Sequence, residues 1–347
     1  MKVLITGGAG FLGLHLAKYF NKQNWRVSIL DIEIPDKAEY PDKITFIKGD
    51  IRDNKLLEKV TKNMDVIVHA AAALPLWKAK EIYDININGT ENVLKAALSN
   101  KVKRVVYISS TAVYGVPKKH PIFEDDPRVG VGPYGESKIA AEELCEKFRK
   151  KGLIITIIRP KTFVGTYRLG VFEILFDWIK DGKKIPVVGN GQNRYQLLDV
   201  DDLVYAVHLF SIHKDGRKIN NTFNIGAKEY KSVKEDMQKL FTYANSGSKI
   251  LTTPAYLVKK VLWTFEKLKL SPLYQWVYDT ADKDSFVSIN KLVKTLNWHP
   301  KYSNSDALIK AYQWYLDHYT EIKSHPAGVT HRVGWKQGIL GLFKRFL

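Results

Sequence analysis

Short runs of β-branched residues alternate with helical segments up to about residue 160, and this alternation constrains the fold more than any other feature of the chain. The expected strands are rich in Val and Ile and are bounded by Gly, Asp or Asn, as buried strands are. They cover residues 3–6, 26–30, 44–48, 66–68, 104–109 and 153–158. The helices between them are expected at residues 11–21, 54–61, 90–98 and 134–150. Elements in this order connect by right-handed crossovers, so the sequence predicts an α/β fold with a doubly wound parallel sheet.

A glycine-rich turn, TGGAGFLG, joins the first expected strand to the first helix. Gly7 and Gly10 allow the positive φ angles of a tight turn and let the backbone approach a pyrophosphate. The charge of that pyrophosphate is stabilised at the helix N-terminus, which Phe11 and Leu12 form. Gly13 lets the helix pack closely on the sheet. The turn therefore predicts a Rossmann-type domain that binds a dinucleotide.

The end of the second expected strand indicates which dinucleotide this is. Asp31 follows Gly13 by 18 residues, close to the spacing of the acid that binds the adenosine ribose. A carboxylate there accepts hydrogen bonds from the ribose hydroxyls and repels a 2′-phosphate. The sequence therefore predicts NAD, rather than NADP, as the cofactor.

The pattern of elements changes after residue 165. Helical stretches dominate the remainder, at 171–180, 200–210, 233–243, 257–268 and 306–318, with strand-like pieces at 185–188 and 222–225. The length of 347 residues favours more than one unit. We expect three regions: an NAD-binding Rossmann domain with later segments returning to it, a smaller and mainly helical substrate-binding lobe, and a basic amphipathic tail, over residues 1–165, 166–320 and 321–347.

Three residues are candidates for the chemistry. Ser110 follows the fifth expected strand, at the carboxyl edge where open α/β sheets bind their ligands. Tyr134 and Lys138 are four residues apart near the start of a helix, so they share one helix face. Other Tyr-Lys pairs have this spacing, but this pair follows both a nucleotide-binding pattern and a serine-bearing strand.

In this order the motifs resemble the extended short-chain dehydrogenase/reductase family, in its NAD-dependent epimerase/dehydratase branch. The chain is similar to the UDP-glucose 4-epimerase group of that branch and has some hydroxysteroid-dehydrogenase-like features. The resemblance covers roughly residues 1–318. It is carried by the TGGAGFLG turn, GDI at 49–51, HAAA at 69–72, NINGT at 86–90, SSTAVYG at 109–115, YGESK at 134–138, RP at 159–160 and LDVDDL at 198–203.

The resemblance implies a catalytic role for each of the three candidates. Tyr134 removes the proton of a substrate hydroxyl while a hydride leaves the same carbon for the nicotinamide, Ser110 holds that oxygen, and Lys138 binds the nicotinamide ribose. A phenol with a pKa near 10 is a poor base at neutral pH. We therefore expect the Lys138 ammonium and the positive nicotinamide ring to lower the pKa of Tyr134.

The resemblance also implies further contacts with the cofactor. Asp50 and Ile51 would flank the adenine, and Asn86 would steady the active-site backbone or a water. Three alanines would line the cofactor cleft: Ala70, Ala71 and Ala72.

The substrate is a nucleotide-diphosphate sugar in the first interpretation. Arg194 stands where the sugar-nucleotide enzymes place an arginine on the diphosphate, and a guanidinium donates two parallel bonds to phosphate. Thr162 would also contact the substrate, although Lys161-Thr162 departs from the Phe-Asn that these enzymes often carry. A second departure is the ADKD segment at 281–284, which lacks their arginine.

Two alternatives stay open. The apolar loop ALPLW at 73–77 favours an NAD-dependent dehydrogenase of a hydroxysteroid- or lipid-like alcohol at a membrane surface. A non-catalytic NAD-binding sensor is disfavoured, because such a protein has no need of both Tyr134 and Lys138.

The tail supplies a possible membrane contact through residues 331–347. On a helical wheel five apolar residues share one side, with Lys344 and Arg345 opposite, as in an interfacial helix: Trp335, Ile339, Leu342, Phe343 and Phe346. Three glycines weaken such a helix, and a docking or flexible tail is the alternative.

Charge and cysteine content limit the partners and the compartment. There are 54 Lys and Arg against 36 Asp and Glu, a formal net charge of +18. We interpret this as a lysine-rich surface and expect no nucleic-acid partner, because no nucleic-acid-binding signature is present. A single cysteine, Cys145, excludes a disulfide framework and a four-thiolate zinc site, and no metal is expected. Without a signal peptide or membrane span, the sequence predicts a cytoplasmic protein; the resemblance implies a homodimer.

Overall fold

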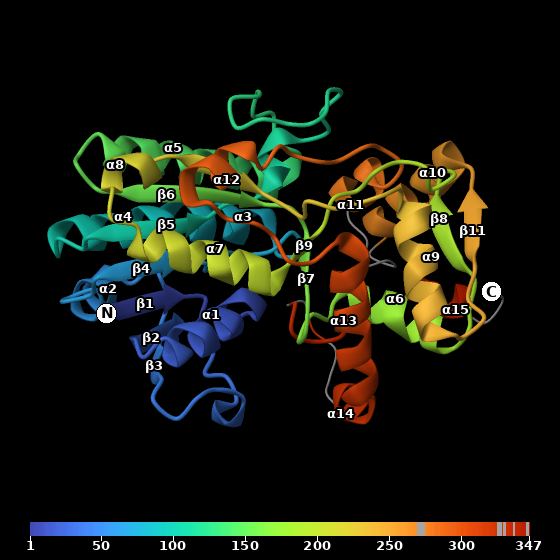
Figure 1. Ribbon diagram of the computed structural model, residues 1–347, viewed down its shortest axis with the longest axis horizontal. Helices are drawn as coiled ribbons and strands as arrows, with labels where there is room; N and C mark the ends of the chain where they lie inside the picture. Colours follow the sequence, from blue (N-terminus) through green and yellow to red (C-terminus); the bar gives the residue numbers. More distant parts are fainter. Residues whose placement is uncertain (269–274, 325–327, 329–330, 336, 345–346) are drawn as a thin grey trace.

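The computed structural model describes residues 1–268, 275–324, 328, 331–335, 337–344 and 347, and it is built around a parallel sheet of seven strands (Figure 1). The strand order is β10-β6-β5-β4-β1-β2-β3, and every pairing is parallel. This confirms the predicted α/β class. The strands are β1 Lys2–Thr6, β2 Arg26–Asp31, β3 Thr45–Lys48, β4 Val66–His69, β5 Arg104–Ile108, β6 Ile155–Pro160 and β10 Thr222–Ile225.

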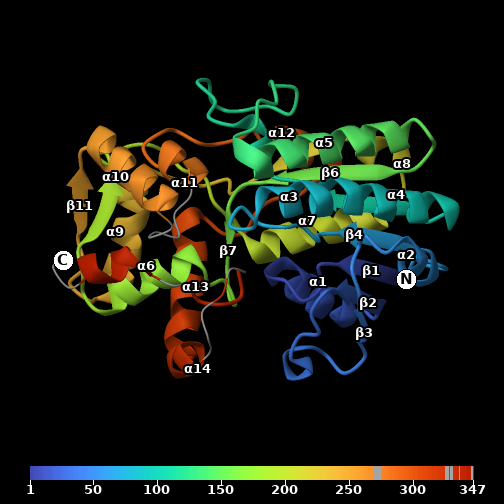
Figure 2. The same ribbon diagram turned by 180° about the vertical axis from the view of Figure 1, so that it is seen from behind.

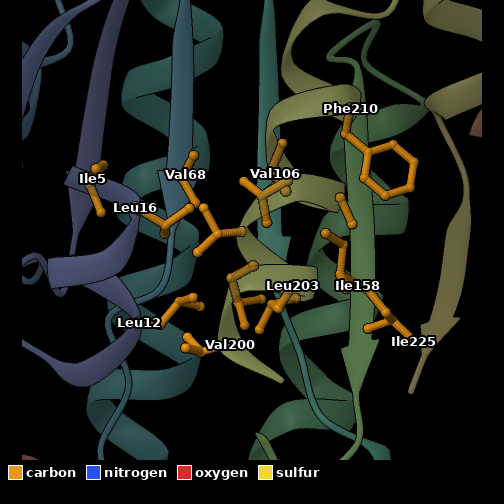
Figure 3. Close-up of a cluster of buried hydrophobic side chains, with 14 of the residues drawn as sticks. Ile5, Leu12, Leu16, Val68, Val106, Ile158, Val200, Leu203, Phe210 and Ile225 are labelled. Atoms are coloured by element: carbon orange, nitrogen blue, oxygen red, sulfur yellow. The ribbon is translucent and has the colours of Figure 1, made fainter. Parts of the chain in front are cut away.

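Helices cover both faces of the sheet, as the buried, Val- and Ile-rich strands require. One face is covered by α1 Phe11–Lys22, α7 Val200–Ile212 and α12 Asn290–Leu296. The other is covered by α2 Asn54–Val60, α4 Thr90–Ser99 and α5 Gly132–Arg149. Figure 3 shows Leu16 of α1 and Leu203 of α7 packing toward Val68 and Val106 of the strands, all of them fully buried.

Segments beyond residue 165 complete this layered unit. β10 pairs with β6, and the neighbouring α12 packs against β10. α7 lies across the sheet beside α1. The short α8 Gly216–Ile219 precedes β10. Before α4 come α3 Ala79–Tyr83 and the wider turn η2 Asp84–Gly89, while the single turns η1 Lys37–Glu39 and η3 Thr111–Tyr114 follow β2 and β5.

The remaining segments form a mainly helical lobe at one end of the sheet (Figures 1 and 2). Two small pairs of strands, β8 with β11 and β7 with β9, support it. Its apolar core lies among α6, α9 and α13. The elements are β7 Phe163–Val164, α6 Val171–Lys180, β8 Ile185–Val188, β9 Leu198–Asp199, α9 Val233–Ala244, β11 Ile250–Thr253, α10 Ala255–Lys267, α11 Gln275–Thr280, α13 Asn304–Asp317, α14 Tyr319–Ser324 and α15 Ile339–Phe343.

The tail differs from the expected amphipathic helix. Within the described residues of 331–347 only α15 is helical, and Trp335 precedes that helix and is buried beside Gly170. Gly338 has a positive φ of 55°, so the helix begins after it. The prediction that Trp335 shares an exposed face with Ile339 is therefore wrong, and Phe346 lies outside the described residues. No described helix is both long and apolar enough to cross a bilayer.

A buried ion pair joins β6 to α5 behind the carboxyl edge of the sheet. The Arg159 guanidinium donates to both carboxylate oxygens of Glu142, at 2.9 and 2.6 Å, and Glu142 is fully buried. The Ser109 hydroxyl donates to the same carboxylate at 2.5 Å. Glu142 thus fixes the end of β5, from which the next residue, Ser110, enters the candidate site.

We expect Glu142→Gln to destabilise the fold by about 3 kcal/mol, because it leaves the buried Arg159 charge without its partner. Urea unfolding followed by tryptophan fluorescence measures this loss. Glu143→Gln is the matched control, since Glu143 is the next residue along α5 and is exposed. Equal stability of the two variants would contradict the assigned role of the pair.

Candidate active site

Ser110 and Tyr134 meet at the carboxyl edge of the sheet. Ser110 follows β5 and caps η3, where its hydroxyl accepts a hydrogen bond from the Ala112 N–H at 3.1 Å. Tyr134 lies in the first turn of α5, which begins at Gly132. Pro133 is in the same turn, where proline is favoured. The Ser110 side chain acts on the Tyr134 hydroxyl and opposes the rise of its pKa. Both residues line a cavity of about 470 Å³.

Lys138 lies one turn further along α5 and is buried. Its ammonium donates to the Ile108 carbonyl at 2.9 Å and lies 5.9 Å from the centre of the Tyr134 ring. Burial lowers the pKa of Lys138 to about 8, against the opposing effect of Glu142. The structure therefore ties Lys138 to the end of β5, on the same helix face as Tyr134.

The electrostatics of the phenol differ from the expectation. Burial raises the pKa of Tyr134 to about 12, while the Ser110 side chain and the charge of Arg168 act in the opposite direction. The prediction that Lys138 lowers this pKa is not supported, since burial outweighs the opposing effects of the protein's own groups.

The glycine turn has the close backbone contacts that its sequence predicts. Gly7 has a φ of 71°, and a Cβ there would lie 2.7 Å from the Ala71 nitrogen. A Cβ on Gly13 would lie 2.3 Å from the Gly7 carbonyl oxygen. Gly10 is the N-cap of α1, and no described side chain caps this helix, so the N-terminus formed by Phe11 and Leu12 keeps its dipole for an anion.

Asp31 lies beside this turn at the end of β2. Its carboxylate accepts hydrogen bonds from the Ala9 N–H at 2.9 Å and from the Glu33 N–H at 3.2 Å. Burial raises the pKa of Asp31, and these hydrogen bonds oppose that shift. The carboxylate is thus held in place beside the turn and is only half-buried.

The other expected cofactor residues surround the same edge. Asp50 forms an ion pair with Arg52, and Ile51 is buried against Gly89. The three alanines, Ala70, Ala71 and Ala72, follow β4 and are half-buried, with Ala71 facing the glycine turn.

Asn86 connects the loop after β4 to α5. Its side-chain carbonyl accepts from the Ala73 N–H at 2.8 Å, and its amide donates to the Ser137 hydroxyl at 3.0 Å. It lies in η2, where the helical turn is wider than an α-turn. Asn86 therefore steadies the backbone around the site.

The cavity beyond Ser110 and Tyr134 has a mainly apolar lining. Apolar side chains come from the loop after β4, from α6 and from α9, and include Leu74, Pro75, Phe172, Leu175 and Met237. Thr162 lines the cavity as well, and its hydroxyl lies 3.2 Å from that of Tyr195.

Arg194, the other expected substrate residue, takes a different position. It does not belong to the described lining, and its guanidinium is half exposed and paired with Asp284 at 2.9 Å. The segment 281–284, noted for its missing arginine, thus supplies the carboxylate that engages Arg194. The structure brings Thr162 to the cavity and leaves Arg194 outside it.

Lys161 is a residue of this cavity to which the sequence analysis gave no role. It is 1% exposed, and its ammonium donates to the Ser285 hydroxyl at 2.6 Å. Burial lowers the pKa of Lys161 to about 7, and no described charged group contributes to this shift. In the sequence, Lys161 was marked only by its departure from the phenylalanine that sugar-nucleotide enzymes often carry at this position.

The tail supplies the second unexpected part of the site. Residues 331–335, here called the strap, run beside the loop before α6: the Leu169 N–H donates to the His331 carbonyl at 2.8 Å and the Gly170 N–H to the Val333 carbonyl at 3.1 Å. His331 and Trp335 line the cavity. The strap therefore forms part of the cavity wall.

Arg332 joins the strap to the glycine turn. Its guanidinium donates to the Ala9 carbonyl at 3.0 Å and pairs with Glu39. Its Nε is buried and has no hydrogen-bond partner among the described residues. Arg332 thus connects the strap to the glycine turn that follows β1.

Comparison with known proteins identifies a family and several relatives that are similar to this chain. The model of the NAD dependent epimerase/dehydratase family matches residues 3–226. Protein y4nG of Sinorhizobium fredii, which is uncharacterized, is 33% identical over 98% of this chain and 84% of its own length. A UDP-glucose 4-epimerase of Halalkalibacterium halodurans is 28% identical over 92% of this chain and 96% of its own. The structure of UDP-glucuronic acid 4-epimerase from Bacillus cereus in complex with NAD is similar, with a TM-score of 0.75 and 25% identity, covering 95% of this chain and 100% of that one.

The residues around the turn fit NAD. The glycine turn leaves no room for a Cβ at Gly7 or Gly13, the α1 N-terminus is available to a diphosphate, and the Asp31 carboxylate beside the turn could accept hydrogen bonds from ribose hydroxyls. The buried and unpartnered Nε of Arg332 adds a donor near the same turn. The described residues contain no cluster of three or more His, Cys, Asp or Glu side chains suited to a metal ion.

We expect Arg332→Ala to release bound NADH about tenfold faster, because it frees the strap from the glycine turn and removes about 1.4 kcal/mol of retention. Stopped-flow fluorescence of the NADH-loaded protein, mixed with excess NAD, measures the rate. Arg217→Ala is the control, since Arg217 is exposed on α8. An unchanged rate in Arg332→Ala would show that the strap does not retain the cofactor.

Proposed function

The chain belongs to the NAD dependent epimerase/dehydratase family, and from this premise we propose that it is an NAD-dependent oxidoreductase that acts on a nucleotide-diphosphate sugar through Ser110, Tyr134 and Lys138. The observation that carries the proposal is that the Tyr134 and Ser110 side chains line one cavity at the carboxyl edge of the sheet, with Lys138 one helical turn beyond Tyr134. This pair offers a proton acceptor and an oxygen-binding hydroxyl at one point.

The chain's own groups would divide the work as follows. Ser110 would donate a hydrogen bond to the substrate oxygen, and Tyr134 would take the proton from it. Lys138, held by the Ile108 carbonyl, would bind the nicotinamide ribose. When bound, the oxidised nicotinamide supplies the hydride acceptor and a positive charge. That charge matters, because burial raises the pKa of Tyr134 to about 12 despite the opposing effects of Ser110 and Arg168.

The substrate class is supported by the relatives. The Halalkalibacterium halodurans and Bacillus cereus proteins are named as epimerases of UDP-sugars, and both align with almost the whole of this chain. In this proposal the sugar occupies the cavity between Ser110 and Thr162, where two hydroxyl groups can bond to it. The nucleotide extends into the lobe.

A second candidate is favoured by the lining of the cavity. Most of the side chains that face it are apolar, including Trp335 of the strap and Phe172 of α6. Such a cavity suits a hydrophobic ring or acyl group better than a sugar, which needs hydrogen-bond partners for each hydroxyl. This candidate is a dehydrogenase of a hydrophobic alcohol, with the same three catalytic residues.

We expect Tyr134→Phe to lower kcat by at least about 100-fold, because the phenyl ring cannot accept the substrate proton. Equilibrium dialysis should give NAD binding close to that of the wild type, since the glycine turn is unchanged. Tyr205→Phe, a partly exposed tyrosine of α7, is the control. Retention of turnover in Tyr134→Phe would remove the proposed base.

The two candidate reactions differ in their NADH balance. We expect the purified protein, offered UDP-sugars and hydroxysteroids in parallel, to convert a UDP-sugar without accumulating free NADH. Absorbance of NADH and mass analysis of the products measure this. One NADH formed per hydrophobic alcohol consumed, with no change in any UDP-sugar, would replace the first candidate by the second.

A further inference from the structure

The outer face of α10 exposes large apolar side chains. Tyr256, Leu257 and Trp263 are 73%, 58% and 51% exposed, and Val261 and Leu268 are also exposed. Only Leu262 of this helix is buried. A helix that belongs to a folded lobe normally turns such residues inward, so the outer face of α10 is suited to a partner.

The neighbouring α15 extends this apolar surface. Leu342 and Phe343 are 56% and 46% exposed, and the Phe343 ring lies 6.4 Å from that of Phe265 on α10. Both helices lie in the lobe, at the end of the molecule away from the sheet (Figures 1 and 2). We call the exposed apolar residues of the two helices the α10–α15 face: Tyr256, Leu257, Val261, Trp263, Leu268, Leu342 and Phe343. They are 7 of the 16 large apolar side chains that are exposed in the described residues.

The charges on this face are positive. Lys260 and Lys267 are exposed on α10, with their ammonium groups 4.5 Å from the centre of the Tyr256 ring and 5.9 Å from that of Trp263. The one acidic residue of α10, Glu266, lines the internal cavity and accepts a hydrogen bond from a tyrosine. The described exposed positions of α10 therefore carry lysine, threonine and apolar residues and no acid.

Further lysines lie beside the end of the chain. The Lys184 N–H donates to the Leu347 carbonyl, and the Ile185 N–H donates to the Lys249 carbonyl. Both lysine residues are exposed. They add positive charge to the surroundings of α15, where Lys344 is itself paired with Asp177 and Asp181. The formal net charge of the whole chain is +18.

From this combination we propose that the α10–α15 face docks the protein on an anionic membrane surface. Aromatic and aliphatic side chains enter the headgroup boundary while neighbouring lysines contact anionic lipid, which supplies the two signals that stable peripheral binding needs. A second copy of the chain fits this face less well, because the lysines of two copies would meet and interface cores are depleted of lysine. The face lies beyond residue 226, where the family match ends.

The proposal changes the expected site of membrane contact. The sequence analysis placed it on residues 331–347, with Trp335 as an anchor, but Trp335 is buried. The larger part of the proposed contact comes from α10, which the sequence analysis did not consider. The proposal is independent of the reaction, because it concerns the surface of the lobe and not Ser110 or Tyr134.

Flotation with two kinds of vesicles tests the proposal on the full chain. We expect the protein to bind vesicles of phosphatidylcholine with phosphatidylglycerol and to bind vesicles of phosphatidylcholine alone weakly. The double variant Leu257→Ser and Trp263→Ser should lose about tenfold in partition coefficient, because both exposed side chains leave the headgroup boundary. Its control is Ile34→Ser with Val129→Ser, two residues that are 50% and 71% exposed outside the face.

A charge variant and two further measurements complete the test. Lys260→Gln with Lys267→Gln should lower binding to the anionic vesicles by about fivefold per lysine. Circular dichroism and NAD content verify that each variant is folded. The proposal is overturned if the wild type binds neither vesicle, or if the control variant loses as much binding as the face variant. It is also overturned if sedimentation velocity shows a dimer that Leu257→Ser with Trp263→Ser dissociates while vesicle binding is unchanged, since a second copy then covers the face.

Discussion

The parallel direction of β1, β4, β5 and β6 is the constraint on which the site depends. Because all four strands run the same way, the glycine turn, the alanines after β4, Ser110 and Thr162 leave the sheet at one edge. The buried pair of Arg159 and Glu142 then holds the ends of β5 and β6 against α5, the helix that carries Tyr134 and Lys138. Residues from distant parts of the sequence thereby become neighbours at one edge.

Burial sets the proton affinities at this edge. It raises the pKa of the Tyr134 phenol and lowers those of the Lys138 and Lys161 ammonium groups, so each is biased toward its neutral form. A positive charge that arrives with a ligand therefore acts in a medium of low dielectric constant, where it changes these equilibria more than it would in water. The protein supplies the positions and the dry surroundings, and the bound partners supply the charge.

The sequence predicted the parts of the molecule that depend on local pattern. The strands, α1, the glycine turn and the spacing of Tyr134 and Lys138 follow from side-chain periodicity and from backbone sterics at Gly7. The strap could not be predicted in this way, since the contact of Arg332 with Ala9 joins residues 323 positions apart. The tail was misjudged because a helical wheel assumes a continuous helix and ignores the packing that buries Trp335. The motif positions of Thr162 and Arg194 predicted contacts with the substrate, whereas the ion pair of Arg194 with Asp284 is set by tertiary structure.

The division between the two halves of the chain has a chemical meaning. The region that the family model matches ends at residue 226 and contains the glycine turn, Ser110, Tyr134 and Lys138. The walls of the cavity, by contrast, are completed by later residues, among them Met237 of α9, Glu266 of α10 and Trp335 of the strap. In the proposed function, the first region would therefore supply the reacting groups, while the later segments would select the molecules that enter the cavity. Since α10 lines the cavity on one side and exposes apolar residues on the other, the same helix can govern both what enters the cavity and where the protein binds.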